Sequence, residues 1–384
     1  MSAQTFRQAR LRPFMGRSHP WLVAEAHAVL VRIPVEPPKG DAIQKFTALE
    51  LPIVRIIDAA GNSGIGFGYT IGQGGSTILE LLQTELLGKL EGEDSRRIGY
   101  VHHFLRKKLH ALGPGVVLSN ALAAIDVALW DLQAKRNRVP LHILLGGAKD
   151  SVPVYNTDVG WLSRGLDEMV ELSRRAVRRD GFRALKLKVG KPDPQEDVER
   201  VGRVRKAVGD HIRLMIDANQ SWTVDEAVRR LPPLEKFNLV WIEEPLLATD
   251  IQGYVELGRH TGIPRAGGES LYGPAYFYQN IRQGALDILQ PDVARVGGIT
   301  PAMEVCGMAQ SANLKVAPHV SPELSLTVAA AVPNSMFIEY IPQMEPVLKR
   351  KIRIVNGNAV PPDTPGHGIE FDEDALRRFE VRSS

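Results

Sequence analysis

A series of short hydrophobic segments between residues 184 and 340 constrains the fold of this chain more than any other feature. Three of these segments end in a carboxylate, at Asp217, Glu243 and Glu269, and the three residues are spaced 26 positions apart. A repeat of this length corresponds to one strand, one loop and one helix. The series continues in the same manner to Asp292, His319 and Glu339. The chain therefore places a polar or ionisable residue at the end of one strand after another.

Strand and helix patterns alternate from residue 152 to residue 340. Eight candidate strands are separated by helical patterns, which include 166–178, 195–208, 224–231 and 301–311. This alternation is typical of a parallel sheet. An open doubly wound sheet is the alternative, but it would not place functional residues at the ends of so many successive strands. We therefore expect a closed α/β barrel with all the strand ends on one face.

The first 150 residues have a different order, in which strands are followed by helices. Strands are expected at 21–33 and 51–58, and helices at 76–90, 94–112 and 119–135. The segment 34–47 is rich in Pro, Lys and Gly, and we expect a long loop there that acts as a lid. The glycine-rich run at 64–69 lacks the spacing of a phosphate-binding loop, so a strand and turn are expected instead.

The chain becomes rich in turns after residue 340, with Gly, Asn and Pro concentrated at 356–368. Such a segment cannot be another barrel repeat, and we expect it to return to the N-terminal unit and pack on it. The expected division is an α+β unit at 1–150, the barrel at 151–345 and a C-terminal segment at 346–384.

Composition excludes several classes of function. The 47 basic and 44 acidic residues give a net charge of +3 spread along the chain, so no nucleic-acid partner is expected. The single cysteine, Cys306, allows neither a disulfide framework nor a cysteine-based zinc site. No run of eighteen apolar residues and no signal-peptide pattern is present, so we expect a soluble cytoplasmic protein without a membrane partner.

The three evenly spaced carboxylates indicate a metal site. Carboxylates brought together at one end of a barrel would repel one another unless a cation lay between them. A set of oxygen ligands without Cys or His suits Mg²⁺. Lys186 and Lys188 lie two positions apart on one strand and therefore point to the same side. If that side faces inward, both lysines stand beside the cation.

Taken together, these motifs resemble the mandelate racemase branch of the enolase superfamily. The residues that carry the resemblance are Lys186-Leu187-Lys188, Asp217-Ala218-Asn219, Glu243-Glu244-Pro245, Gly268-Glu269, Asp292, His319, Glu339 and the tail from Pro362 to Gly368. The resemblance covers the whole chain. It implies a modified TIM barrel, (β/α)7β, with an α+β N-terminal capping domain that carries substrate-specificity loops and is completed by the C-terminal tail.

The resemblance also implies a role for each residue of the site. Asp217, Glu243 and Glu269 would bind one Mg²⁺ per subunit, with Glu244 in a supporting role. Lys188 would be the base, with a pKa lowered by burial and neighbouring positive charge, and Lys186 would contact the substrate carboxylate. Asp292 would orient His319, which would act from the opposite side as acid or base. Asn219 and Glu339 would contact the substrate.

Within this branch the chain is most similar to acid-sugar dehydratases of the galactarate and talarate type. We therefore expect a Mg²⁺-dependent hydro-lyase that forms a 2-keto-3-deoxy acid from a small carboxylate substrate, and a homo-oligomer by resemblance. Racemisation or epimerisation of a 2-hydroxy acid uses the same groups and is the alternative. A catalytically silent binding protein is a third hypothesis. A cycloisomerase that uses a lysine on the sixth strand is disfavoured by the presence of Asp292 and His319.

Overall fold

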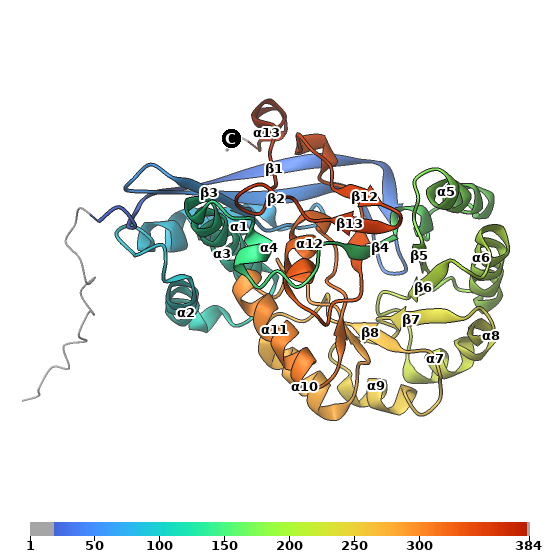
Figure 1. The fold of residues 1–384 in the computed structure, drawn as a ribbon. Helices are drawn as coiled ribbons and strands as arrows, with labels where there is room; N and C mark the ends of the chain where they lie inside the picture. Colours follow the sequence, from blue (N-terminus) through green and yellow to red (C-terminus); the bar gives the residue numbers. More distant parts are fainter. Residues whose placement is uncertain (1–18, 382–384) are drawn as a thin grey trace, which may run out of the picture.

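The structure is a computed structural model that describes residues 19–381, and it contains an N-terminal α+β unit and a barrel (Figure 1). The N-terminal unit begins with an antiparallel sheet in the order β1-β2-β3, formed by β1 (Val23–Gly40), β2 (Lys45–Asp58) and β3 (Ser63–Phe67). The helices α1 (Gly75–Leu81), α2 (Ile98–Lys108), α3 (Val116–Asn137) and α4 (Leu141–Leu144) follow. A π-helical turn at Leu82–Leu86 and 3-10 turns at Leu87–Lys89 and His110–Leu112 lie between them.

The glycine-rich run forms the strand β3, as the sequence predicted. Its glycines are required because the strand packs directly on the backbone of α3. A Cβ atom on Gly64 would lie 2.1 Å from the carbonyl oxygen of Ala128, and one on Gly66 would lie 2.3 Å from that of Ala124. Any larger residue at these positions would push the strand away from the helix.

The prediction of a long lid loop at 34–47 was wrong, because most of this segment is extended strand. β1 runs to Gly40 and β2 starts at Lys45, so only a short turn separates them. Prolines argued against a strand because they cannot donate a ladder hydrogen bond. However, β1 is an edge strand, and its register breaks between Pro34 and Lys39, where Pro37 and Pro38 lie. The segment is therefore a β-hairpin that reaches the barrel, where Lys39 Nζ lies 2.7 Å from Asp158 Oδ1.

The barrel consists of eight parallel strands, which confirms the predicted fold class. The strands are β4 (Val152–Asn156), β5 (Ala184–Lys188), β6 (Arg213–Asp217), β7 (Leu239–Glu243), β8 (Arg265–Gly267), β9 (Ile288–Leu289), β10 (Lys315–Val316) and β11 (Ile338–Tyr340). They pair in sequence order, and β11 pairs with β4. A parallel bridge from Val316 to Ser335 closes the ring.

Seven helical connections join these eight strands, so the barrel has (β/α)7β topology. They are α5 (Leu166–Arg178), α6 (Pro194–Val208), α7 (Val224–Arg230) with α8 (Pro232–Glu235), α9 (Ile251–Leu257), α10 (Pro274–Gln283), α11 (Ile299–Ser311) and α12 (Pro322–Ala331). A short 3-10 turn at Asp158–Gly160 precedes α5. Figure 1 shows these helices arranged around the strands.

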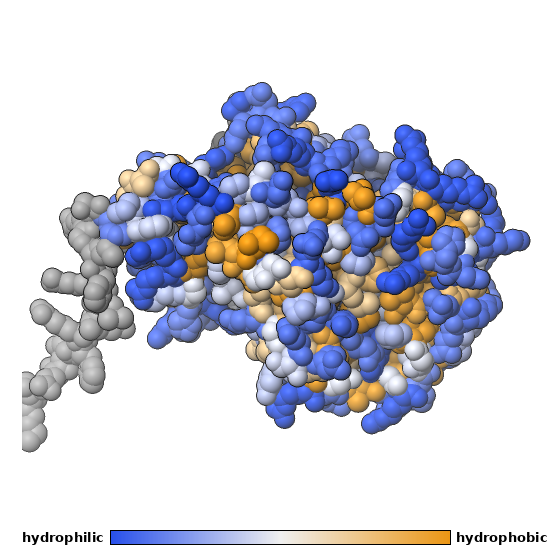
Figure 2. Space-filling view, viewed as in Figure 1, coloured by the Kyte–Doolittle hydropathy of each residue, from blue (hydrophilic) through white to orange (hydrophobic). Residues whose placement is uncertain are grey.

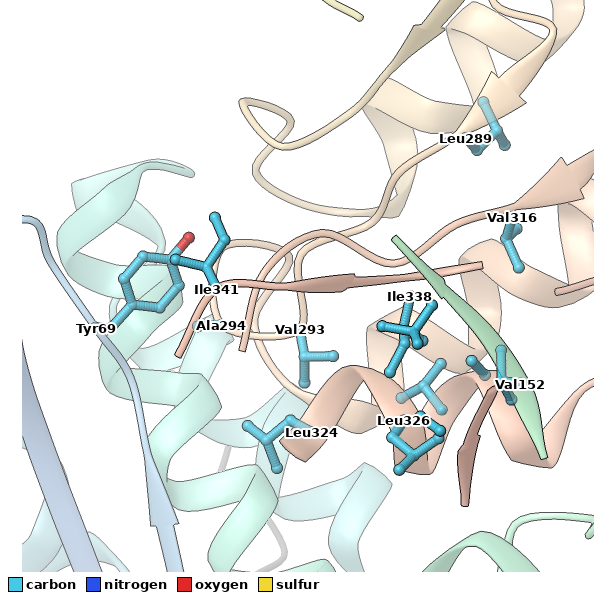
Figure 3. Packing of buried hydrophobic residues seen from close by; sticks show 14 of the residues in the cluster. Tyr69, Val152, Leu289, Val293, Ala294, Val316, Leu324, Leu326, Ile338 and Ile341 are labelled. Carbon is cyan, nitrogen blue, oxygen red and sulfur yellow. The ribbon is translucent and has the colours of Figure 1, made fainter. Parts of the chain in front are cut away.

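One buried apolar residue from each barrel strand or its immediate flank forms a layer across the interior. The layer consists of Tyr155, Ala184, Met215, Trp241, Ala266, Ile288, Ala317 and Phe337. A larger cluster packs the strands against the surrounding helices and includes Tyr69 from the N-terminal unit together with Ala294 and Ile341 from the barrel (Figure 3). The inner layer closes the lower part of the barrel, so the carboxyl ends of the strands form the floor of any site above it.

The C-terminal segment contacts both the barrel and the N-terminal unit. After the 3-10 turn Glu345–Val347, the strands β12 (Arg353–Val355) and β13 (Asn358–Val360) form a hairpin, and β13 pairs antiparallel with β4. The chain then reaches β3, where buried His367 Nε2 lies 2.8 Å from the carbonyl oxygen of Ile65. The last helix, α13 (Glu373–Phe379), lies beside the N-terminal sheet (Figure 1), and Arg55 pairs with Glu373 across this contact.

The helix α3 is the one helix among residues 19–381 that is long and apolar enough to cross a membrane by length and composition alone. Its most apolar window is 78% buried inside the protein. Packing against β3 and the neighbouring helices therefore accounts for its composition. Hydrophilic residues dominate the face seen in the space-filling view, and the hydrophobic patches on it are scattered (Figure 2).

Candidate active site

The polar residues of the site lie two positions beyond the apolar layer on most of the barrel strands. Because side chains alternate along a strand, these residues point to the same side as the layer, which is the barrel interior. They are Thr157, Lys186, Asp217, Glu243, Gln290, His319 and Glu339, and all are buried. On β8 the equivalent position is Gly268, which has a φ of 135°. This turn allows the next residue, Glu269, to reach the site.

The structure brings together all ten residues to which the sequence analysis assigned a role. Lys186 and Lys188 lie on β5, and each is paired with carboxylates. Lys186 Nζ lies 2.6 Å from Glu243 Oε1 and 2.8 Å from Glu339 Oε1. Lys188 Nζ lies 2.5 Å from Asp217 Oδ2. We call these two lysines with Asp217 and Glu243 the lysine side of the site.

The pKa of Lys188 does not move in the expected direction. Burial lowers it, but the carboxylates of Asp217, Glu269 and Glu243 together outweigh burial and raise the pKa above its usual value. The pKa of Lys186 is raised well above its usual value for the same reason, because Glu243 and Glu339 outweigh its burial. A lysine beside such a carboxylate keeps its proton and cannot act as a base. A second cation must therefore share the negative charge of Asp217 before Lys188 can lose its proton and take one from a substrate.

His319 and Asp292 form the other half of the site. His319 Nδ1 lies 2.7 Å from Asp292 Oδ2, and Nε2 lies 2.7 Å from Glu269 Oε2. Burial alone would lower the pKa of the imidazole, but Glu269 and Asp292 raise it to about 10. His319 is therefore a charged imidazolium near neutral pH in this arrangement. We call His319, Asp292 and Glu269 the histidine side.

Two residues that the sequence analysis missed complete the histidine side. The Tyr69 hydroxyl donates to Asp292 Oδ2 at 2.6 Å, so the same oxygen contacts both Tyr69 and His319. Figure 3 shows Tyr69 entering from the N-terminal unit beside Ala294. Arg295 lies 5.4 Å from the Tyr69 ring centroid and contacts Glu269 Oε1 at 3.4 Å. Arg295 could have been found by its place three residues after Asp292, whereas nothing in the sequence links Tyr69 to this strand.

Glu339 lies between the lysine side and the histidine side and contacts both Lys186 and His319. Its Oε1 accepts from Thr157 Oγ1 at 2.5 Å, and its Oε2 accepts from the Val320 amide at 3.1 Å. Burial raises the pKa of Glu339, but Lys186 and His319 outweigh it and lower the pKa to about 2. Glu339 is therefore ionised in this arrangement and can only accept hydrogen bonds.

Asn219 and Glu244 sit at turns where β6 and β7 end. Both have positive φ angles, 45° and 34°, which non-glycine residues rarely adopt outside special sites. The Asn219 amide donates to Asp217 Oδ1 at 2.9 Å, while its side-chain Oδ1 is buried without a hydrogen-bond partner. Burial and the nearby Glu269 raise the pKa of Glu244 to about 8. These two residues border the carboxylates and have unused polar atoms.

The chemistry of the cluster fits a divalent cation. Six carboxylates meet there, from Asp217, Glu243, Glu244, Glu269, Asp292 and Glu339, against the four positive groups of Lys186, Lys188, Arg295 and His319. This excess of acidic over basic groups affects Glu243, because burial and the nearby Asp217 raise its pKa to about 7. A cation bound here would relieve this repulsion, and the predominance of carboxylate oxygens favours Mg²⁺.

The arrangement offers two possible ligand sets. Single atoms of Glu243, Glu269 and His319 lie within 4.8 Å of one another, while Asp217 is engaged by the two lysines. We prefer the all-carboxylate set of Asp217, Glu243 and Glu269, because Mg²⁺ favours oxygen over imidazole. His319 is in addition oriented by Asp292, which suits proton transfer more than metal binding.

Fold and site together define a member of the enolase superfamily, and two family models match the chain. Residues 24–146 match the mandelate racemase / muconate lactonizing enzyme N-terminal domain, and residues 168–375 match the enolase C-terminal domain-like family. The chain belongs to the mandelate racemase branch of this superfamily, as the resemblance implied.

Several relatives are similar to this chain over almost its full length. A 3,6-anhydro-alpha-L-galactonate cycloisomerase from Streptomyces coelicolor is 35% identical and covers 94% of this chain and 100% of its own. An L-talarate/galactarate dehydratase from Salmonella typhimurium is 36% identical and covers 91% of this chain and 88% of its own. The solved structure of an L-talarate dehydratase from Polaromonas sp. JS666, complexed with Mg and L-glucarate, has a TM-score of 0.89 at 36% identity and covers 94% and 98% of the two chains.

Proposed function

We propose that this protein is a Mg²⁺-dependent dehydratase of an acid sugar, such as the aldarates galactarate and talarate, and that its product is a 2-keto-3-deoxy acid. One observation carries the proposal. A lysine and a histidine, each paired with a carboxylate, approach the same carboxylate cluster from strands β5 and β10. Dehydration next to a carboxylate needs a base at the α carbon and an acid at the β hydroxyl. The dehydratases from Salmonella typhimurium and Polaromonas support the substrate class.

The reaction needs two proton transfers, and this chain has a group for each. Lys188 takes the α proton, and the electron pair is first shared with the carboxylate as an enediolate. The pair then forms a double bond between the α and β carbons as the β carbon–oxygen bond breaks. His319, which is charged near neutral pH, gives its proton to the departing hydroxyl, which leaves as water. The resulting enol then rearranges to the keto acid. Lys186, Glu339 and Asn219 position the substrate carboxylate.

Asp217, Glu243 and Glu269 would hold the Mg²⁺. When bound, the ion supplies positive charge beside the substrate carboxylate, where negative charge grows as the α proton leaves. It would also share the charge of Asp217 and so weaken the hold of that carboxylate on Lys188. Mg²⁺ should therefore raise the thermal midpoint of the protein, by an amount that grows with the logarithm of the Mg²⁺ concentration above Kd, and Glu269→Gln should reduce this shift. An unchanged shift in Glu269→Gln would contradict the ligand set.

The relative from Streptomyces coelicolor supports a second candidate, an isomerase of an anhydro acid sugar. The same base and acid would serve it, with a ring oxygen in place of the hydroxyl as the leaving group. Racemisation or epimerisation at the α carbon is a third use of the same pair, in which His319 returns a proton to the α carbon. A silent binding protein would hold Mg²⁺ and acid sugars without turnover.

The deciding experiment is turnover of a library of mono- and diacid sugars and their anhydro forms with Mg²⁺, run in parallel in D₂O. Keto-acid formation that is lost in Lys188→Ala and His319→Asn would establish the dehydratase and identify its substrate. Deuterium uptake at the α carbon without keto acid would establish a racemase or epimerase. Turnover of anhydro forms alone would establish the isomerase, and no signal at all would favour the binding protein.

We also propose that the protein is cytoplasmic and forms a homo-oligomer. Its substrate is a small soluble acid, and its one cysteine, Cys306, is buried and free, which suits the cytoplasm. A homo-oligomer is supported by large apolar side chains that remain exposed on α10 and in the loop after β7. Leu247 is 60% exposed and Tyr278 is 50% exposed. Light scattering of the purified protein tests the oligomer.

A further inference from the structure

A cleft separate from the carboxylate cluster lies between the N-terminal unit and the barrel. Its volume is about 480 Å³, which is within the range of small-molecule sites. The helix α2 forms one wall, and the loops after β8 and β9 form the other, at Tyr272-Gly273 and Val296-Gly297. Figure 1 shows α2 beside α11, which follows the second of these loops. The proposed reaction uses none of the residues of α2.

The charge of the cleft is one-sided. Five basic side chains line it, from His102, His103, Arg106, Lys107 and His110, and no acidic side chain among the described residues does so. His103, Arg106, Lys107 and His110 are spaced three, four and seven positions apart, which places them on one face of α2 and the turn that follows. Arg106 and Lys107 are exposed, and neither has an ion-pair partner within residues 19–381.

Stabilisation of the helix end explains only part of this arrangement. Basic residues near the end of a helix interact favourably with its dipole, and Arg106, Lys107 and Lys108 all occupy the last turn of α2. Lys108 does not line the cleft, and its Nζ lies 5.6 Å from the Phe104 ring centroid. The helix dipole therefore explains why the last turn of α2 is basic. It does not explain why the positive charges of Arg106 and Lys107 face the cleft.

The opposite wall keeps the cleft in a fixed shape next to the active site. His102 Nε2 lies 3.0 Å from the Gly297 carbonyl oxygen, which joins α2 to the loop after β9. The half-buried Tyr272 lines the cleft, and its pKa is raised by burial, with Asp292 and Glu269 adding to the effect. Tyr272 thus lies within electrostatic reach of the histidine side. The start of α3, which no side chain caps, borders the cleft as well.

We propose that this cleft is a second anion-binding site, which takes a small multivalent anion carrying carboxylate or phosphate groups. Arg106 and Lys107 provide the principal charges, and the histidines add hydrogen-bond donors. The bound anion lies outside the barrel and does not take part in the reaction, so this inference stands independently of the proposed function.

The test is calorimetric titration of the full chain in Mg²⁺ with inorganic phosphate in one arm and succinate in the other. We expect saturable binding in at least one arm, and the tighter arm identifies phosphate or carboxylate as the preferred group. The double variant Arg106→Gln/Lys107→Gln should weaken binding at least about tenfold, because it removes both principal charges. Lys108→Gln removes a charge from the same turn outside the cleft and should leave the affinity unchanged.

Three results would overturn the proposal. One is the absence of binding in both arms, and another is equal weakening by the double variant and by Lys108→Gln, which would indicate a general charge effect. The third is binding that survives the double variant but is lost in Lys188→Ala, which would place the anion in the active site. All three changes within α2 are at exposed positions, and matching circular dichroism spectra would show that the variants are folded.

Discussion

The lysine side and the histidine side of the site perform comparable tasks but are built in different ways. Both lysines lie on one strand, β5, and their partners come from other strands of the barrel. The histidine side needs the segments that follow three barrel strands, β8, β9 and β10, and Tyr69 from the N-terminal unit. The lysine side is thus a property of the barrel alone, whereas the histidine side is complete only when the two units are packed together.

This difference indicates where each half can be perturbed. A change within the N-terminal unit can reach His319 through Tyr69 and Asp292, because Tyr69 and His319 both hydrogen-bond to the same oxygen of Asp292. No such connection to the N-terminal unit exists for Lys186 among the described residues, since its charged partners are Asp217, Glu243 and Glu339. Substitutions of Lys188, His319 and Tyr69 test this contrast, and a substitution of Glu323 tests the helix that follows His319; they are given from the largest expected effect to the smallest.

Removing Lys188 should abolish the first proton transfer. We expect Lys188→Ala to lower keto-acid formation by about four orders of magnitude, the upper range for loss of a positioned base. α-Proton exchange in D₂O should fall in parallel, because both processes begin with the same step. Lys191→Ala, which removes a lysine just beyond β5, is the matched control and should keep full activity. Exchange that persists in Lys188→Ala would assign the base elsewhere.

Removing His319 should separate the two proton transfers. His319→Asn should lower keto-acid formation by about three orders of magnitude while α-proton exchange continues, because Lys188 is still present. The comparison of exchange with product formation in D₂O measures this directly. If exchange stops together with product formation, the two sides do not divide the reaction as proposed, and His319 has a part in the first step.

The helix α12, which follows His319 along the chain, contains a carboxylate that destabilises the fold. Glu323 lies four residues after His319, is 8% exposed, and has an Oε2 atom without a hydrogen-bond partner. Burial raises its pKa to about 7, above the 4.5 of an unperturbed glutamate. As pH rises from 4.5 through 7, the unfolded chain releases this proton more readily than the folded protein, so the free energy of unfolding falls.

Glu323→Gln should remove the fall in the free energy of unfolding that Glu323 causes at high pH. We expect it to raise the free energy of unfolding by about 2 kcal/mol at pH 8 and to have little effect at pH 4, where Glu323 is protonated in both states. Urea denaturation at the two pH values measures this. Glu304→Gln, at an exposed position on α11, is the control. An equal effect of Glu323→Gln at both pH values would show that ionisation is not the cause.

The smallest effect is expected from Tyr69→Phe, which removes one hydroxyl. We expect kcat to fall about tenfold, the value of one hydrogen bond to a charged group, with KM nearly unchanged because the Tyr69 hydroxyl donates to Asp292. Tyr100→Phe, at an exposed position on α2, should have no effect. A larger loss in KM than in kcat would mean that Tyr69 acts on substrate binding and not through Asp292.

The sequence predicted most of the lysine side because a strand is a local structure with a fixed period. Lys186 and Lys188 had to point to the same side, and the even spacing of Asp217, Glu243 and Glu269 indicated the same level of a repeated unit. Thr157 and Gln290 were missed, although they lie two positions beyond the buried layer residues Tyr155 and Ile288. Their signal is recognisable only once the register of each strand is known.

Features that depend on long-range packing could not be predicted in this way. Tyr69 lies 223 positions from Asp292, and only the docking of the two units brings them together. The direction of the Lys188 pKa depended on how closely Asp217 lies, which spacing does not reveal. The hairpin at 34–47 was missed because the position of β1 at the edge of its sheet, which makes its prolines harmless, is a property of the assembled sheet.

The path of the C-terminal segment has a consequence for how the protein is made. His367 binds the backbone of Ile65 from the strand β3, and α13 lies against the sheet formed by residues 23–67. A ribosome releases those early strands long before it reaches residue 367. The unit that emerges first is therefore completed last, and its outer surface remains uncovered until the final residues leave the ribosome.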